Sequence, residues 1–196
     1  RRERTTTPHE RAEREFRRAV DLLKQGRGPE AEDGFAAALS HEPAHRAARQ
    51  ALVALSLERG QLENARRLLS EGLAINPGQP EFAVALARIL IERKDYTGAL
   101  LALQGPSLMA PNHSELNLMR ATVLQRMGRH SEAADAYRSS LQLQASSPQG
   151  WIGLGISLEA LKQRPEAAEA FRRALAAGPV SDELKTFAEQ RLRALR

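Results

Sequence analysis

Residues 148–181 read PQGWIGLGISLEALKQRPEAAEAFRRALAAGPVS and decide the fold, because this stretch is the clearest copy of a repeated unit. Apolar residues recur in it every three or four positions, which is the spacing of amphipathic helices. Pro179 comes directly after a glycine near the end, where proline stops a helix. The stretch therefore predicts two helices joined by a turn.

The same length recurs along the chain. Four prolines mark it with spacings of 34, 34 and 68 residues, namely Pro43, Pro77, Pro111 and Pro179. Aligning the chain on this period predicts five units without a gap: 12–45, 46–79, 80–113, 114–147 and 148–181.

Three positions of the unit carry a packing pattern. The twentieth position is always alanine: Ala31, Ala65, Ala99, Ala133 and Ala167. The twenty-fourth is always bulky: Phe35, Leu69, Leu103, Tyr137 and Phe171. The eighth is always small or slim: Ala19, Val53, Ala87, Ala121 and Gly155. Two helices approach closely only where short side chains face large ones, so these positions predict the contact inside each pair of helices.

Turn residues separate the two helices of each unit. Gly26, Gly60 and Gly128 occupy the break that Lys94, Asp95 and Tyr96 fill in the third unit. Glycine there supplies a left-handed cap for the first helix. The pattern predicts ten helices and essentially no strand.

Both ends of the repeat array have their own signals. Thr7, Pro8 and Glu10 are typical of a helix start, so residues 1–11 are expected to form a tail, frayed over residues 1–6, and the beginning of the first helix. Residues 182–196 predict a capping helix that covers the last apolar face of the array.

The third unit is irregular, because Gly105 and Pro106 fall where its second helix should still run. Proline inside a helix costs about 3 kcal/mol. We expect this helix to stop near Gln104, with Leu108 and Met109 packing back against the core. The irregularity is either a tolerated loop or a local change in pitch that shapes a binding face.

Composition excludes several classes of protein. The chain of 196 residues has no cysteine, which excludes disulfides, thiolate metal sites and cysteine nucleophiles. No apolar run reaches the roughly 18 residues of a membrane span. The net charge is +5, but residues 1–30 contribute +3 of it, and arginine and glutamate intermix. Without a concentrated basic face, no nucleic-acid partner is expected.

One string of residues imitates a catalytic metal site. Residues 41–45 spell His-Glu-x-x-His, in which two histidines on one helical turn bind zinc. Here Pro43 places the string across a turn, so the geometry fails. His9, His113 and His130 have no assigned role. We expect no catalytic residue, no metal and no cofactor, and the chain is not predicted to be an enzyme.

These residues resemble the tetratricopeptide repeat (TPR) family. The fifth unit matches its pattern best, with Trp151, Leu154, Gly155, Leu158, Ala167, Phe171, Ala174 and Pro179 in register. The resemblance covers residues 12–181, although Arg18 and Arg120 replace an expected leucine. It implies an all-α fold: a right-handed superhelical α-solenoid of five helix-turn-helix units plus a C-terminal capping helix.

The resemblance also implies a concave groove lined by the first helix of each unit. The groove positions are Phe16, Val20, Gln50, Val84, Arg88, Ile91, Leu118, Thr122, Gln125, Arg126, Ile152, Ile156 and Glu159. Many are apolar, which favours a peptide or helix of a protein partner. Arg88 and Arg126 are expected to orient acidic groups and Glu159 basic ones. Superhelical packing or a homo-oligomer is the alternative use of this row.

The chaperone-binding class of TPR proteins clamps a C-terminal carboxylate with lysine and asparagine. Phe16 and Val20 stand where the first two of those residues belong. This departure disfavours carboxylate clamping.

A narrower resemblance covers residues 105–196. The run from Gly150 to Leu161 and the ending at residues 189–192 are similar to bacterial MSHA-type (type IV-like) pilus biogenesis proteins. This resemblance implies a periplasmic repeat region with an inner-membrane anchor upstream of Arg1, and pilus-assembly components as partners. The alternatives are a cytoplasmic TPR adaptor or co-chaperone and, further off, an RNA-binding solenoid or a zinc hydrolase.

Overall fold

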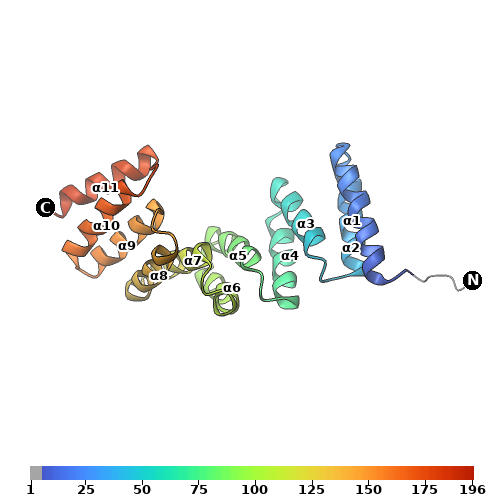
Figure 1. The fold of residues 1–196 in the computed structure, drawn as a ribbon, viewed down its shortest axis with the longest axis horizontal. Helices are drawn as coiled ribbons and strands as arrows, with labels where there is room; N and C mark the ends of the chain where they lie inside the picture. The colour runs from blue at the N-terminus through green and yellow to red at the C-terminus, as the bar shows by residue number, and fades with distance from the viewer. Residues whose placement is uncertain (1–5) are drawn as a thin grey trace, which may run out of the picture. The chain divides into compact units, whose positions relative to one another are not determined.

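The computed structural model describes residues 6–196, which form eleven helices and no strand. The first ten follow one another as five pairs joined by short turns (Figure 1). The first helices of the pairs are α1 (Pro8–Lys24), α3 (Arg46–Glu58), α5 (Pro80–Glu92), α7 (Ser114–Arg126) and α9 (Pro148–Ala160). The second helices are α2 (Gly28–His41), α4 (Leu62–Ile75), α6 (Tyr96–Met109), α8 (His130–Leu143) and α10 (Arg164–Ala176). A last helix, α11 (Asp182–Ala194), packs against α10. The all-α fold is confirmed.

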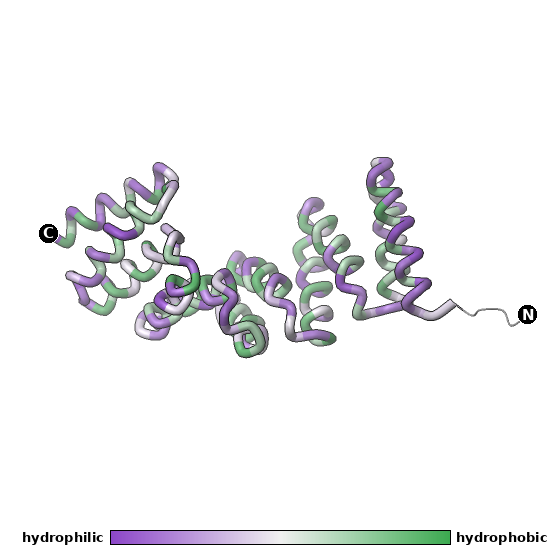
Figure 2. Tube along the Cα trace, viewed as in Figure 1, coloured by the Kyte–Doolittle hydropathy of each residue, from purple (hydrophilic) through white to green (hydrophobic). Residues whose placement is uncertain are grey.

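The chain divides into two compact bodies, each described by itself: an N-terminal body, residues 1–82, and a C-terminal body, residues 83–196. In the N-terminal body, α1 packs against α2 and α3 against α4. In the C-terminal body, α7 packs against α8 and α9 against α10. Hydrophobic residues recur between hydrophilic ones along these helices (Figure 2), and they supply the buried core of each body.

The predicted packing pattern is confirmed. All five alanines at the twentieth position are 0% exposed, and the five bulky residues at the twenty-fourth are at most 2% exposed. A Cβ atom built on Gly155 would lie 2.8 Å from Cε1 of Phe171, and one built on Gly34 would lie 2.8 Å from Cβ of Ala19. The paired helices therefore approach so closely that a methyl group at these glycines does not fit.

The turn inside each pair uses a left-handed residue. Gly26, Gly60 and Gly128 have φ angles of 75°, 68° and 74°, as the sequence predicts. Lys94 and Lys162 take the same place in the third and fifth units with φ angles of 60° and 61°. A lysine in this conformation is strained, because its Cβ crowds the following carbonyl oxygen.

The residue before each of α3, α5, α7, α9 and α11 recurs with the 34-residue period, and at four of these five positions its side chain caps the helix. The side chains of His45, His113, Ser147 and Ser181 accept a hydrogen bond from the backbone N–H three residues on. Gln79 occupies the same position and instead donates to the carbonyls of Gly72 and Asn76, both at 3.0 Å. At the start of the chain, Thr7 and Glu10 form the predicted capping box. Residues 1–5 of the expected tail lie outside the described residues.

The prediction for α6 is wrong. This helix does not stop near Gln104 but runs through Pro106 to Met109. Gly105 has no Cβ to clash with the proline ring, and Pro106 itself is buried in the packing, so the local cost of proline is outweighed. Leu108 and Met109 do not pack back against the core. They are 80% and 62% exposed.

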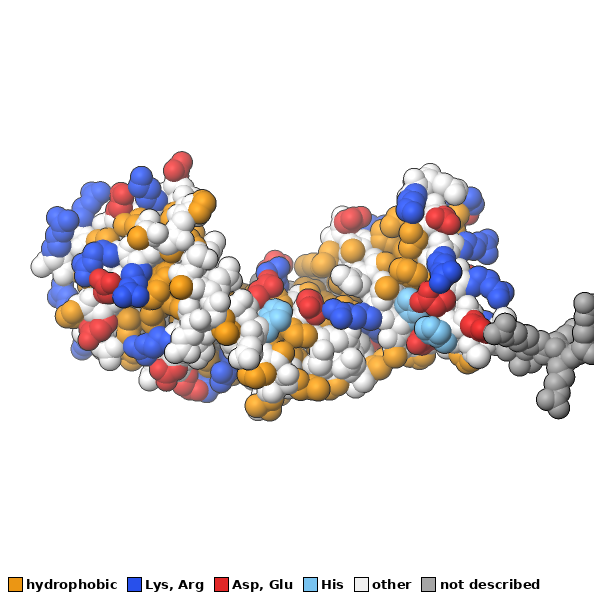
Figure 3. Space-filling view, in the orientation of Figure 1, with side chains coloured by type: hydrophobic (Ala, Val, Ile, Leu, Met, Phe, Trp, Pro, Cys, Tyr) orange, Lys and Arg blue, Asp and Glu red, His pale blue; other side chains and the backbone are white. Residues whose placement is uncertain are grey.

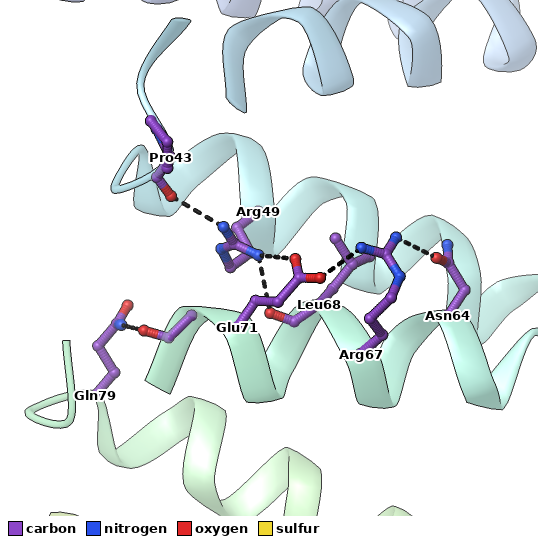
Figure 4. Close-up of polar contacts among 8 residues, drawn as sticks. Pro43, Arg49, Asn64, Arg67, Leu68, Glu71 and Gln79 are labelled. Carbon is purple, nitrogen blue, oxygen red and sulfur yellow. Dashed lines mark hydrogen bonds and ion pairs between the residues drawn. The ribbon is translucent and has the colours of Figure 1, made fainter. Parts of the chain in front are cut away.

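A buried arginine joins three elements of the N-terminal body (Figure 4). Arg49 of α3 is 4% exposed, and its guanidinium donates to the carbonyl of Pro43 at 2.9 Å and to that of Leu68 at 3.0 Å. It also contacts the carboxylate of Glu71 at 3.2 Å. Arg67 holds the other oxygen of Glu71 at 2.8 Å. Hydrogen bonds from Arg67 and then Arg49 lower the pKa of Glu71, so this carboxylate stays charged beside the arginines.

Candidate peptide-binding groove

In the C-terminal body, the first helices lie side by side and are tied by polar side chains. α7 packs against α9. Gln125 makes this contact: its Nε2 donates to the carbonyl of Gly153 and to the hydroxyl of Ser157, both at 2.8 Å. Its Oε1 accepts from the hydroxyl of Tyr137 at 3.2 Å. Burial raises the pKa of Tyr137, so its hydroxyl remains a donor. The amide of Gln125 is therefore fully engaged in holding α7, α8 and α9 together.

The contact between α9 and α11 follows the same plan with charged residues. Glu159 holds the position of Gln125 one repeat later, and it accepts a hydrogen bond from Nε of Arg191 at 3.0 Å and a second from Nη2 of the same guanidinium. This two-point pairing fixes α11 beside α9. The rings of Phe187 of α11 and Phe171 are steeply inclined to each other, with ring centres 6.2 Å apart.

A shallow recess of about 440 Å³ opens between α9 and α11. Its lining residues are Ile156, Glu159, Ala160, Phe187 and Arg191. Three of these residues are apolar, and the other two, Glu159 and Arg191, pair with each other. Such a recess accepts an apolar side chain more readily than a charged one, because a buried charge needs a partner.

Charges of the first helices differ in how far they are neutralised. Arg88 of α5 contacts Glu115 of α7 at 2.5 Å, so its charge is paired within the chain. Arg126, the last residue of α7, is exposed and has no carboxylate partner among residues 6–196. Ala160 is the last residue of α9, so Arg126 and the recess lie at the same end of two neighbouring helices. Arg126 does not line the recess itself but lies at the corresponding end of α7, the helix that packs against α9.

Family models for tetratricopeptide repeats match residues 22–83, 56–123 and 118–182. The chain belongs to the tetratricopeptide repeat family. Proteins with these repeats bind peptide or protein partners, and their fold is typically a non-catalytic scaffold. No curated protein matches the chain in sequence.

Solved structures share the fold at low sequence identity. YrrB, described as a TPR protein with an unusual peptide-binding site, is 16% identical, with a TM-score of 0.74 and 90% of each chain covered. A MamA structure from Desulfovibrio magneticus RS-1 is 16% identical, with a TM-score of 0.70, 86% of this chain and 95% of that chain covered. PilF of Pseudomonas aeruginosa is 17% identical, with a TM-score of 0.69, 96% of this chain and 90% of that chain covered.

The structure places the predicted groove residues of this TPR chain at different depths. Val84 and Ile152 are only 4% and 5% exposed, so these two belong to the packing between helices and do not offer surface. Their assignment to the partner-binding groove stays a prediction. The half-buried members are Phe16, Val20, Ile91, Leu118, Thr122, Gln125, Ile156 and Glu159, and the exposed ones are Gln50, Arg88 and Arg126.

Two half-buried members have clear packing roles. The ring of Phe16 lies 5.7 Å from that of Phe35 and 5.0 Å from that of His45. The hydroxyl of Thr122 donates to the carbonyl of Leu118 at 3.0 Å, inside α7. Neither side chain is free to select a partner, whereas Ile156 and Arg126 are.

The His-Glu-x-x-His string lies across a turn, as expected. His41 ends α2, and His45 precedes α3. Nδ1 of His45 accepts from the N–H of Ala48 at 3.1 Å, and its Nε2 lies 3.1 Å from Glu13. Both ring nitrogens are thus engaged in structure. Within residues 6–196, no three histidine, aspartate or glutamate side chains are grouped to hold a metal, and no helix combines the length and apolar character of a membrane crossing.

Sequence reasoning misses Phe187 and Arg191 as groove residues. It assigns residues 182–196 only to a cap, although α11 completes the recess. A signal is present in the sequence: Arg191 lies 32 residues after Glu159, the same offset that separates Gln125 from Ser157. The offset alone does not show which side chains meet until the helices are placed.

Proposed function

We propose that this chain is a non-enzymatic scaffold that binds a segment of another protein along the first helices of its C-terminal body. The observation that carries the proposal is the recess between α9 and α11, open and apolar, at the same helix end as the unpaired charge of Arg126. A segment with an apolar residue and an acidic residue fits this chemistry.

The other charges of the groove row also favour a partner with an acidic residue. Arg88 and Glu159 are neutralised by Glu115 and Arg191, so they add little net attraction. Arg126 is then the charge in this row that a partner can still pair. An ion pair at an exposed site contributes up to about 1 kcal/mol, so the apolar side chain in the recess supplies most of the affinity.

Binding of selected peptides tests this assignment. A random peptide library selected on the folded chain should yield peptides that combine an apolar and an acidic residue. Ala160→Arg fills the recess from an exposed position and should weaken the selected peptides at least about tenfold. Ala176→Arg is the matched control, because Ala176 is the exposed last residue of α10, a second helix. Equal binding by wild type and Ala160→Arg would remove the recess from the proposal.

The finer proposal is a role in assembling a type IV-like pilus or a secretion system, with pilus-assembly components as partners. It is supported by the resemblance of residues 105–196 to MSHA-type pilus biogenesis proteins and by the likeness in fold to PilF. Coexpression with the inner-membrane proteins of such an assembly tests it. Co-elution that Ala160→Arg reduces is the expected result, and independent elution of every component contradicts it.

A periplasmic location belongs to the same proposal, with an inner-membrane anchor upstream; the alternative is a cytoplasmic adaptor. Alkaline phosphatase is active only after export, so its fusion to the C-terminus of the full-length reading frame separates the two. An active fusion supports the periplasm, whereas an inactive but folded fusion favours the cytoplasmic adaptor.

A further inference from the structure

The outer face of α6 is the most exposed apolar surface of the C-terminal body. Leu108, Leu101 and Met109 are 80%, 71% and 62% exposed, above every other large apolar side chain among the described residues. Leu101, Gly105 and Leu108 are spaced four and three residues apart, so they lie on one face of the helix. Figure 3 shows hydrophobic side chains at the surface over α6.

The other second helices provide an internal comparison, because they present the same positions to solvent. Where α6 has Leu101, they have charged residues: Asp33, Arg67, Asp135 and Glu169. Where α6 has Leu108, they have small or polar residues: Ser40, Ala74, Gln142 and Ala176. Residues 96–109 include no charged side chain at all. The repeat pattern would place charge on this face, and only α6 departs from it.

The face has a shape that suits a copy of itself. A Cβ atom built on Gly105 would meet nothing within 4 Å, so this point is a gap between two protruding leucines. A two-fold axis near Gly105 would place Leu101 of one copy beside Met109 of the other and would set Gly105 opposite Gly105, where the absence of side chains lets the two helices approach closely. Exposed leucines on both sides of a gap are self-complementary in this way.

Charge points to the same occupant. A charged partner would find no group of opposite charge on α6. Two copies of this uncharged face, in contrast, can meet without repulsion between like charges. We propose that α6 pairs with α6 of a second copy of this chain in an antiparallel, two-fold symmetric contact. The groove lies on first helices and α11, so this contact leaves the recess open.

Sedimentation velocity over about 1–100 µM protein tests the pairing. The wild type should show a monomer–dimer equilibrium. Leu101→Asp with Leu108→Ser installs residues that the first repeat has at these positions, and it should raise the dimer dissociation constant at least about tenfold, since both copies lose both contacts. The helical circular dichroism should not change, because both side chains are exposed. Leu143→Gln on α8, where Leu143 is 44% exposed, is the control and should dimerise as wild type.

A cysteine cross-link locates the axis. The chain has no cysteine of its own, so Gly105→Cys introduces a single thiol. Mild oxidation should trap Gly105→Cys as a covalent dimer, whereas Ser139→Cys, at the same position of α8, should stay monomeric on a denaturing gel. A wild type that is monomeric throughout the concentration range overturns the proposal. So does a dimer that the leucine substitutions leave intact, or a monomer whose α6 face binds lipid vesicles or another protein instead.

Discussion

The indole Nε1 of Trp151 donates a hydrogen bond to the carbonyl of Ala145 at 2.8 Å, across the turn that enters α9. The side chains of Arg49 and Asn117 hold the same position of their repeats. They make the same bond to Pro43 at 2.9 Å and to Pro111 at 2.8 Å, in each case six residues back. Three unlike side chains are therefore equivalent in the structure, since each satisfies a carbonyl of the turn between repeats and fixes the direction of the next helix.

Arg49→Leu should lower the free energy of unfolding by about 1–3 kcal/mol, because it leaves the carbonyls of Pro43 and Leu68 without their donor in a buried site. Arg49→Trp restores an N–H donor like that of Trp151. Its free energy of unfolding should therefore fall by less than half as much as that of Arg49→Leu. Urea denaturation measures both. If the two variants are equally unstable, the hydrogen bond to the turn carbonyl is not what makes position 49 stabilising.

Lys162→Gly should raise the free energy of unfolding by about 1 kcal/mol, because the φ angle of 61° strains lysine but not glycine. Gly128→Ala, with φ of 74°, should lower it by about 1–2 kcal/mol for the converse reason. Thermal unfolding of both variants measures these two changes in stability. A stabilising Gly128→Ala would contradict the account of these turns.

The pKa of His9 is raised by its hydrogen bond to Glu42 and by the charge of that carboxylate. A raised pKa in the folded state adds stability below about pH 6.5, the ordinary value, and this contribution is lost as the pH rises through the raised pKa. NMR titration of the His9 ring should give a midpoint above the ordinary value. In Glu42→Gln the midpoint should fall toward it, and an unchanged midpoint would mean that Glu42 is not the cause.

Glu159 and Arg191 should couple by about 0.5–1 kcal/mol in a double-mutant cycle of Glu159→Gln and Arg191→Gln, as expected for a paired but partly exposed contact. The measurement is the free energy of unfolding in urea. Arg172 and Glu169 of α10 form a neighbouring pair on one helix and serve as the reference. Additive effects at Glu159 and Arg191 would show that the pairing does not hold α11 in place.

Much of this fold can be predicted from the sequence, because the period of 34 repeats an alanine, a bulky residue and a small or slim residue at fixed positions five times over. Such a pattern has few other physical explanations. The burial of the groove residues is predicted less well. The positions of Val84 and Ile152 in the repeat predict surface residues, but how deep a side chain lies depends on how closely its neighbours approach. Pro106 shows a further limit, since its local cost is visible in the sequence and the packing that outweighs it is not.

Chemical-shift mapping tests the central claim most directly. The ¹⁵N-labelled chain is titrated with a peptide selected from the library, and the amide shifts are read at each residue. We expect the largest changes at Arg126, Ile156, Ala160 and Phe187, around the recess and the free guanidinium. Changes confined to the second helices, with these four residues unmoved, would contradict the claim that the first helices bind the partner.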